Sequence, residues 1–257
     1  MATATVSHLR EGFHTLTPYL VVNGAVQTID FMKQAFGAEE KGRYPAPDGR
    51  IMHAEVKIGD SMVELGESNE QFPNRPGALH IYLPDADAAY ERALAAGATT
   101  LHAPVNQPYG DHEASVRDPA GNNWYIATHL GGRHVPEGLR TVTPYLHAAG
   151  TDKLIDFLKQ AFGAEEIGVH RSEDGTVVHA KLRIGDSVLE MGEAHGQWQA
   201  MPMGLHFYVP DTDAVYRRAM EAGAKSLFAP EDKPYGERSG GVLDVAGNSW
   251  FIATPLK

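Results

Sequence analysis

Apolar and polar residues alternate along several short segments of the chain, and a period of two is typical of a half-buried strand. The clearest case is residues 51–58, where one face carries the apolar residues Met52, Ala54, Val56 and Ile58. Short segments that are β-branched, aromatic or alternating predict further strands. These segments are 17–22, 38–44, 61–65, 78–83, 98–103, 112–117 and 123–128.

Two segments show helical spacing instead. Residues 25–36 place apolar side chains three or four positions apart, and Gly37 follows where a C-terminal glycine cap belongs. Residues 85–96 begin with Asp85, a good N-cap residue, and Gly97 follows them as a stop signal. The predicted order is therefore strand, helix and three strands, followed by the same order again.

The whole pattern then repeats. TPYL begins at Thr17 and again at Thr143, and AGNNWYIAT from Ala120 returns as AGNSWFIAT from Ala246. One constant offset aligns these segments and the repeats IDF-x-KQAFGAEE, IGDS and PYG without a gap. A period this long is a whole domain. Residues 130–140, rich in glycine and with a proline, indicate the connection, so the predicted domains are 1–131 and 132–257.

The predicted fold class is therefore α+β, with two tandem domains and two βαβββ modules in each. The four strands of a module should form a curved antiparallel sheet with helices over one face. Alternation along the last strand of each copy turns Trp124 and Trp250 toward the helices, which predicts that both are core residues.

Composition and charge narrow the class of protein. The chain of 257 residues is 42% apolar and 21% charged, as expected of a globular protein that buries a core. A net charge of −11 disfavours nucleic acid as a partner, and the lack of cysteine excludes thiolate sites. The chain shows no signal-peptide core and no apolar run long enough for a membrane span, so we expect a cytoplasmic protein with no membrane partner.

The double βαβββ order, with DPAGN before the last strand of the first copy, resembles the vicinal-oxygen-chelate superfamily, which includes glyoxalase and bleomycin-resistance proteins. The segments TPYL, AFGAEE and GN-x-W-x-IAT resemble its PhnB-like branch more narrowly. The resemblance covers nearly the whole chain, once per copy. It implies that the sheets of each copy close into a cup that holds the functional site.

The resemblance also implies four metal-ligand positions in each copy. Two of them keep a ligand, Glu64 and His80 in the first copy, whereas the other two are Thr17 and Tyr125. The second copy has the same pattern at Thr143, Glu190, His206 and Phe251. Strand alternation adds a histidine to each copy, which suggests two-histidine, one-carboxylate sets suited to Fe, Mn or Zn. The candidate metal ligands are His53, Glu64 and His80, and His179, Glu190 and His206.

The same cup offers a second interpretation. Aromatic side chains with a few fixed polar groups form a typical small-molecule pocket, in which rings stack on planar ligands and carboxylates hold cations. The two PYG segments add a tyrosine each at the expected mouth of a cup. The candidate ligand-binding residues are Tyr19, Glu64, His80, Tyr82, Tyr109, Tyr125, Tyr145, Glu190, His206, Tyr208, Tyr235 and Phe251.

Two functions therefore stay open. The leading hypothesis is a small-molecule binding protein that needs no cofactor and sequesters a toxic or antibiotic compound. The alternative is a lyase, isomerase or dioxygenase that uses a divalent metal. In both cases the two copies should pack as an internal pseudo-dimer, and a further homodimer of the chain stays open.

Overall fold

The computed structural model describes residues 8–256 of the chain. Within this range the order of strand, helix and three strands occurs four times. The predicted α+β class and the predicted repeat of βαβββ modules are confirmed. None of the helices in residues 8–256 has the length and the apolar character needed to cross a membrane.

Each copy contains eight strands and two helices. The elements of the first copy are β1 (Leu16–Val22), α1 (Ala25–Phe36), β2 (Glu39–Pro45), β3 (Ile51–Ile58), β4 (Ser61–Glu67), β5 (Ala78–Tyr82), α2 (Ala86–Ala95), β6 (Thr99–Asn106), β7 (Asp111–Arg117) and β8 (Asn123–His129). Those of the second copy are β9 (Val142–Ala148), α3 (Thr151–Phe162), β10 (Glu165–Arg171), β11 (Val177–Ile184), β12 (Ser187–Glu193), β13 (Gly204–Tyr208), α4 (Thr212–Glu221), β14 (Lys225–Lys233), β15 (Glu237–Leu243) and β16 (Ser249–Pro255).

The helix ends follow the predicted signals. Asp85 caps α2 by accepting a hydrogen bond from the Ala88 amide at 2.8 Å. Gly37 ends α1 in the left-handed conformation, with φ of 68°, which a glycine adopts without steric cost. The start of α1 is capped from outside, because the Glu67 carboxylate accepts the Gly24 and Ala25 amides at 2.7 and 2.9 Å.

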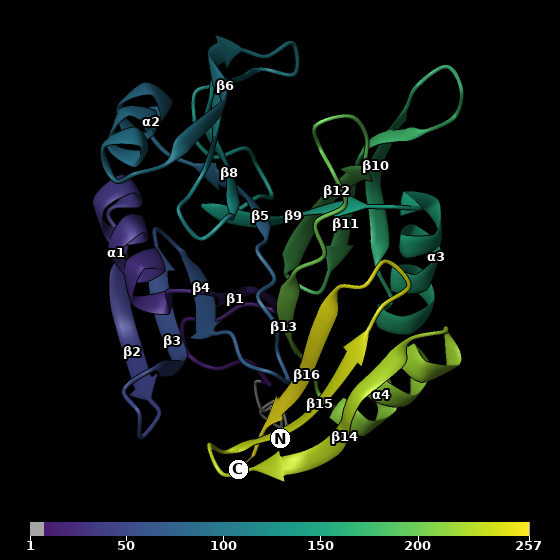
Figure 1. Ribbon diagram of the computed structural model, residues 1–257. Coiled ribbons are helices and arrows are strands. Elements are labelled where there is room, and N and C mark those ends of the chain that lie inside the picture. Colours follow the sequence, from purple (N-terminus) through teal and green to yellow (C-terminus); the bar gives the residue numbers. More distant parts are fainter. Residues whose placement is uncertain (1–7, 257) are drawn as a thin grey trace, which may run out of the picture.

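The strands form two eight-stranded sheets, and each sheet takes four strands from each copy (Figure 1). One sheet has the order β14-β15-β16-β13-β1-β4-β3-β2, and the other has the order β10-β11-β12-β9-β5-β8-β7-β6. The copies are joined where β1 pairs with β13 and where β5 pairs with β9. The sheets were predicted to be antiparallel, and most neighbouring strands are, but β1 and β4 pair in parallel, as do β5 and β8. The helix that follows β1 and β5 lets each of these strands pair with a parallel neighbour.

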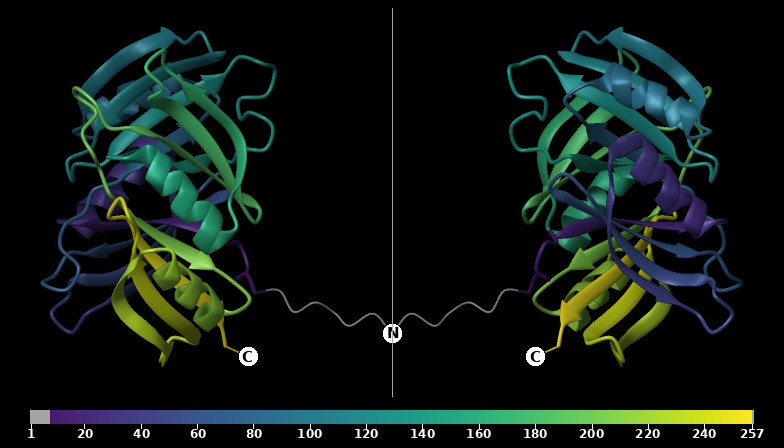
Figure 2. Two further views of the ribbon diagram at one scale, coloured as in Figure 1. Left: turned by 90° about the vertical axis from the view of Figure 1, so that its right-hand side faces the viewer. Right: turned by 90° about the vertical axis from the view of Figure 1, so that its left-hand side faces the viewer.

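The two tryptophans of the apolar core, in contrast, each pack against a helix of their own copy. Trp124 of β8 packs against Phe31 and Phe36 of α1, with ring centroids 6.3 and 4.8 Å away. Trp250 packs in the same way against Phe162 of α3. Both tryptophans are fully buried, which confirms their prediction as core residues. Figure 2 shows the result, with α1 and α2 on one side of the molecule and α3 and α4 on the other.

The alternation in β3 holds only in part. Ala54, Val56 and Ile58 are buried as predicted, whereas Met52 has 64% of its surface exposed. The ladder between β3 and β4 starts only at the pair of Ala54 and Leu65. Met52 therefore lies outside the part of β3 that pairs with β4.

The two IGDS turns lock the copies together. Asp186 accepts the Thr15 amide at 2.8 Å, and Ser187 Oγ accepts the Leu16 amide at 3.0 Å. The first copy does the same in return, because Asp60 accepts the Thr141 amide at 2.9 Å. Each turn thus caps the first strand of the other copy. Burial alone would raise the pKa of both aspartates, but the hydrogen bonds outweigh burial and hold each pKa below its usual range.

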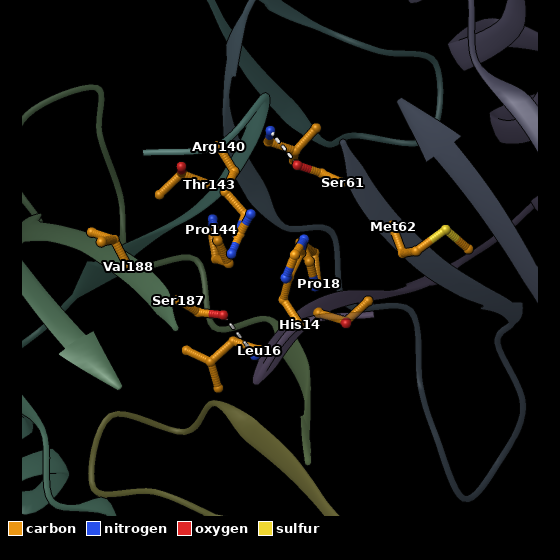
Figure 3. Close-up of a pocket in the computed structure, with 12 residues that line it drawn as sticks. His14, Leu16, Pro18, Ser61, Met62, Arg140, Thr143, Pro144, Ser187 and Val188 are labelled. Atoms are coloured by element: carbon orange, nitrogen blue, oxygen red, sulfur yellow. Dashed lines mark hydrogen bonds between the residues drawn. The ribbon is translucent and has the colours of Figure 1, made fainter. Parts of the chain in front are cut away.

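A small cavity of about 20 Å³ lies between these turns. Figure 3 shows His14 and Arg140, which occupy equivalent positions in the two copies, beside this cavity. Both reach Asp186, with His14 Nδ1 at 2.8 Å and an Arg140 nitrogen at 3.0 Å. The junction is therefore built from charged and hydroxyl groups around an approximate twofold axis.

The tight approach at this junction predicts the effect of Gly59→Ala. A Cβ atom on Gly59 would press on the Thr141 hydroxyl and lie 2.9 Å from Thr141 Cβ. Gly175 also has a positive φ, of 88°, but no neighbour lies within 4 Å of its added Cβ. We expect Gly59→Ala to lower the free energy of unfolding by about 1–3 kcal/mol more than Gly175→Ala. Urea denaturation measures this difference, and equal losses would contradict the described junction.

Candidate functional site

Each eight-stranded sheet carries one candidate site on the face opposite its helices. We call the face lined by β1–β4 and β13–β16 the first cup, and the face lined by β5–β8 and β9–β12 the second cup. In the first cup, His206 Nδ1 lies 2.8 Å from Glu64 Oε2. In the second cup, His80 Nδ1 lies 2.8 Å from Glu190 Oε2. Each buried carboxylate therefore meets a histidine from the other copy.

This arrangement corrects the predicted grouping of the site residues. The sets His53–Glu64–His80 and His179–Glu190–His206 are wrong as groups, because β4 and β5 of one copy belong to different sheets. The structure brings together His53, Glu64 and His206 in the first cup, and His179, Glu190 and His80 in the second. The expectation that each copy closes its own cup is wrong for the same reason.

The aromatic candidates divide between the cups in the same way. Tyr19, Tyr208 and Phe251 lie in the first cup, where the rings of Tyr19 and Phe251 are 5.1 Å apart and Tyr208 stacks on His206 at 4.4 Å. The second cup contains Tyr82, Tyr109, Tyr125 and Tyr145. Tyr109 and its counterpart Tyr235 are 61% and 68% exposed.

The second cup contains a cavity of about 590 Å³. This volume falls within the range of about 300–1,000 Å³ that is typical of small-molecule pockets. Four rings stand close together on one wall: Tyr125, Tyr145, His147 and Trp198. Tyr125 is 5.3 Å from Tyr145 and 5.6 Å from Trp198, while His147 stacks parallel to Trp198 at 5.8 Å. The wall thus offers a set of aromatic surfaces.

One hydrogen bond orders this wall. The Tyr125 hydroxyl lies 2.5 Å from His147 Nε2, and both side chains are buried. Burial, reinforced by nearby His195, lowers the pKa of His147 to about 4. The imidazole is therefore neutral at pH 7, so Nε2 can accept a hydrogen bond from the Tyr125 hydroxyl.

The floor of the second cup is a buried ionic network around Glu190. Lys181 Nζ lies 3.1 Å and His179 Nε2 lies 3.4 Å from Glu190 Oε1, while His80 holds the other oxygen. Glu113 Oε2 lies 3.2 Å from His80 Nε2, although the two are not aligned as a hydrogen bond. The buried carboxylate is thus compensated by cations.

The protonation of this network follows from its charges. Burial alone would disfavour the charged imidazolium of His80, but Glu190 and Glu113 outweigh burial and raise the pKa of His80 to about 10. For Glu190, burial is again opposed, here by His80, His179 and Lys181, and its pKa lies well below the usual range. At neutral pH the pair is therefore an imidazolium and a carboxylate.

The first cup has the same frame but different charges. Glu55 stands where the second cup has Lys181, because strands β3 and β11 are equivalent. Arg10 reaches into this cup from the segment before β1, with one guanidinium nitrogen 2.8 Å from Glu55 Oε1 and the other 3.4 Å from the Tyr208 hydroxyl. Phe13 follows Arg10 and packs on Tyr208 at 5.7 Å. The first cup therefore holds an internal guanidinium.

Several residues of the cups were not predicted from the sequence. Glu55, Glu113, Lys181, Glu237 and His147 all contribute side chains to them. The strand period could have indicated two of these residues. Glu55 lies two positions after His53, and His147 lies two positions after Tyr145, so each shares a strand face with a predicted site residue. The family resemblance points only to positions that the two copies share. The residues that were not predicted differ between the copies, so the resemblance could not indicate them.

Sequence comparison now identifies the family. A sequence model of the Glyoxalase/Bleomycin resistance protein/Dioxygenase superfamily matches residues 8–126 and 146–252. The chain belongs to this superfamily. Its tandem domains fit an internal pseudo-dimer of superfamily modules, whereas the narrower resemblance to the PhnB-like branch stays a prediction.

Individual relatives agree with this assignment. Uncharacterized proteins of Mycobacterium bovis and Mycobacterium tuberculosis are each 38% identical over 122 residues, which is 43% of this chain and 80% and 72% of those proteins. The crystal structure of glyoxalase I from Zea mays superposes with a TM-score of 0.71 at 19% identity, over 93% of this chain and 92% of that one. At this identity the structural similarity shows a shared fold.

The metal positions that the superfamily resemblance implies do not fit the residues present. In the first cup they fall on Thr17, Glu64, His206 and Phe251, which adjacent strands do bring together. However, the two retained ligands bond to each other, and a phenyl ring offers no ligand atom. In the second cup, the ammonium of Lys181 already lies beside Glu190. We therefore derive no chemistry from an ion at these positions.

The ionic network of the second cup predicts a dependence of stability on pH. The pKa of His80 is about 10 in the folded protein and about 6.5 in an unfolded chain. Its contribution to stability is therefore complete below about pH 6.5 and is lost as pH rises toward 10. NMR titration should find the His80 ring still protonated at pH 8.

A substitution of Glu190, the partner of His80, tests the same network. Glu190→Gln should lower the pKa of His80 toward its usual value and reduce the free energy of unfolding by about 3–5 kcal/mol, because one charge of a buried pair is left alone. Glu173→Gln, at an exposed position, is the control and should change neither quantity. A neutral His80 at pH 8 in the unsubstituted protein would contradict the described network.

Proposed function

We propose that this protein binds a small molecule in the second cup and sequesters a toxic or antibiotic compound. The observation that carries the proposal is the cavity of about 590 Å³, with an aromatic wall above a buried ionic floor. Concave, mostly apolar pockets with a few fixed polar groups are the usual sites for small ligands.

The wall defines the shape of the ligand. Tyr125 and Trp198 meet at 5.6 Å with a 58° angle between their planes, and Tyr145 adds a third ring. Rings in such arrangements offer faces and edges to a planar partner, with an energy of about 0.5–1.5 kcal/mol for each aromatic pair beyond the area buried. A planar aromatic compound suits this wall.

The floor defines the polar groups of the ligand. Glu190 has its charge neutralised by His80 and Lys181, so it is not free to hold a second cation. Glu113 and the neutral imidazole of His147 also line the cavity. A carboxylate accepts hydrogen bonds only, so we infer that the ligand carries hydrogen-bond donors, such as amino or hydroxyl groups, on its aromatic frame.

A metal-dependent lyase, isomerase or dioxygenase is the second candidate function. One observation favours it, which is the cluster of His53, Glu55 and Glu64 in the first cup. Against it stands the poor fit of the inherited ligand positions. The two candidates thus use different cups, so one set of variants can separate them.

Matched substitutions in the two cups test the proposed binding site. A thermal-shift screen with planar aromatic compounds that carry amino or hydroxyl groups provides the ligand, and calorimetric titration measures its dissociation constant. Tyr125→Ala should weaken binding about tenfold or more, which corresponds to about 1.4 kcal/mol. Its counterpart in the first cup, Phe251→Ala, should change the constant less than about twofold.

Trp198→Ala and Phe72→Ala form a second matched pair, since these residues are also equivalent by position. Equal weakening by both members of each pair would place the ligand outside the second cup. If no compound of this chemical class raises the melting temperature, the proposal fails for planar aromatic ligands.

A further inference from the structure

We propose that the first cup holds one divalent metal ion on His53, Glu55 and Glu64. This site is displaced from the positions that the superfamily resemblance implies, because it uses β3 and leaves out Thr17, His206 and Phe251. The proposal does not depend on ligand binding in the second cup.

The geometry of the three side chains fits one ion. His53 Nε2 lies 3.4 Å from Glu55 Oε1 and 3.8 Å from Glu64 Oε1, and one ligand atom from each residue lies within 4.8 Å of the others. Ligand atoms bound about 2.1 Å from the same ion lie roughly 3–4 Å from each other. Small side-chain rotations would complete the set.

A buried oxygen points to a cation at this place. Glu64 is fully buried, and its Oε2 is held by His206. Its Oε1 has no hydrogen-bond partner among the described residues and faces His53. A buried carboxylate oxygen without a partner is costly, and a metal ion would supply the missing interaction.

The second cup shows how the same oxygen is satisfied when a cation is present. Glu190 Oε1, the counterpart of Glu64 Oε1, has Lys181 Nζ at 3.1 Å. Lys181 lies directly opposite Glu190 on the neighbouring strand, whereas Glu55 lies directly opposite Glu64. Like charges in facing positions of a sheet repel each other. The first cup therefore lacks the lysine that compensates the equivalent carboxylate in the second cup.

Arg10 modulates the proposed site without completing it. Its guanidinium bonds to Glu55 Oε1, so it competes with an ion for that carboxylate, and its other hydrogen bond goes to Tyr208 rather than to Glu64. The side chain of Arg10 is 34% exposed. We therefore expect that removal of Arg10 strengthens metal binding.

The ligand atoms define the kind of ion. One imidazole and two carboxylates suit Mn²⁺, Fe²⁺ or Zn²⁺, and a hard set with two carboxylates favours Mn²⁺ over soft ions. Mn²⁺ is also the cleaner probe, because the imidazoles of the second cup would attract Zn²⁺ or Ni²⁺.

Titration of the full chain with Mn²⁺ alone, followed by electron paramagnetic resonance of the free ion, tests the proposal. We expect one bound Mn²⁺ per chain. Glu55→Lys copies the charge of the second cup into the first and should weaken this binding at least tenfold, and His53→Ala should do the same. Arg10→Ala should tighten the binding.

The reciprocal variant should gain metal binding, and misfolding cannot produce such a gain. Lys181→Glu adds a second carboxylate beside His179 and Glu190, so this one substitution gives the second cup the ligand set of the first. The protein should then bind two Mn²⁺ ions per chain. Circular dichroism checks that each variant keeps its fold. Mn²⁺ binding that is equally weak in the unsubstituted protein and in Glu55→Lys, or equally tight in both, would overturn the proposal.

Discussion

The architecture depends on two buried carboxylates, Glu64 and Glu190, and each of them bonds to a histidine of the other copy. A charge buried without its partner costs several kcal/mol, so neither copy can form its cups alone with these charges satisfied. The sheets cross between the copies, whereas Trp124 and Trp250 each pack against a helix of their own copy. Fusion of the copies in one chain keeps the required partner at a high local concentration.

Much of the fold could be predicted because its signals are local. The helix over residues 25–36 and the strand over residues 51–58 were predicted with the bounds that the structure shows. Their apolar spacing and the neighbouring glycines act within a few residues. Burial of Trp124 and Trp250 followed from strand alternation in the same way.

The pairing of modules could not be predicted from the repeat. Because the two copies are similar in sequence, β1 has the same local reasons to pair with β5 or with its equivalent β13. The choice is made by contacts far apart in sequence, such as the capping of Leu16 and Thr15 by the turn at Asp186 and Ser187. The site residues were therefore largely named but wrongly grouped. The contrast between Glu55 and Lys181 was visible in the sequence, but it gained meaning only when both were found opposite equivalent glutamates.

The two cups are equivalent by position but differ in their charged residues, and we propose that the second one holds the small-molecule ligand. A crystal structure of the protein with a compound from the screen tests this most directly. We expect one ligand per chain, stacked on Tyr125 and Trp198 above the network of Glu190. Ligand density against Tyr19 and Phe251 in the first cup, or outside both cups, would contradict it.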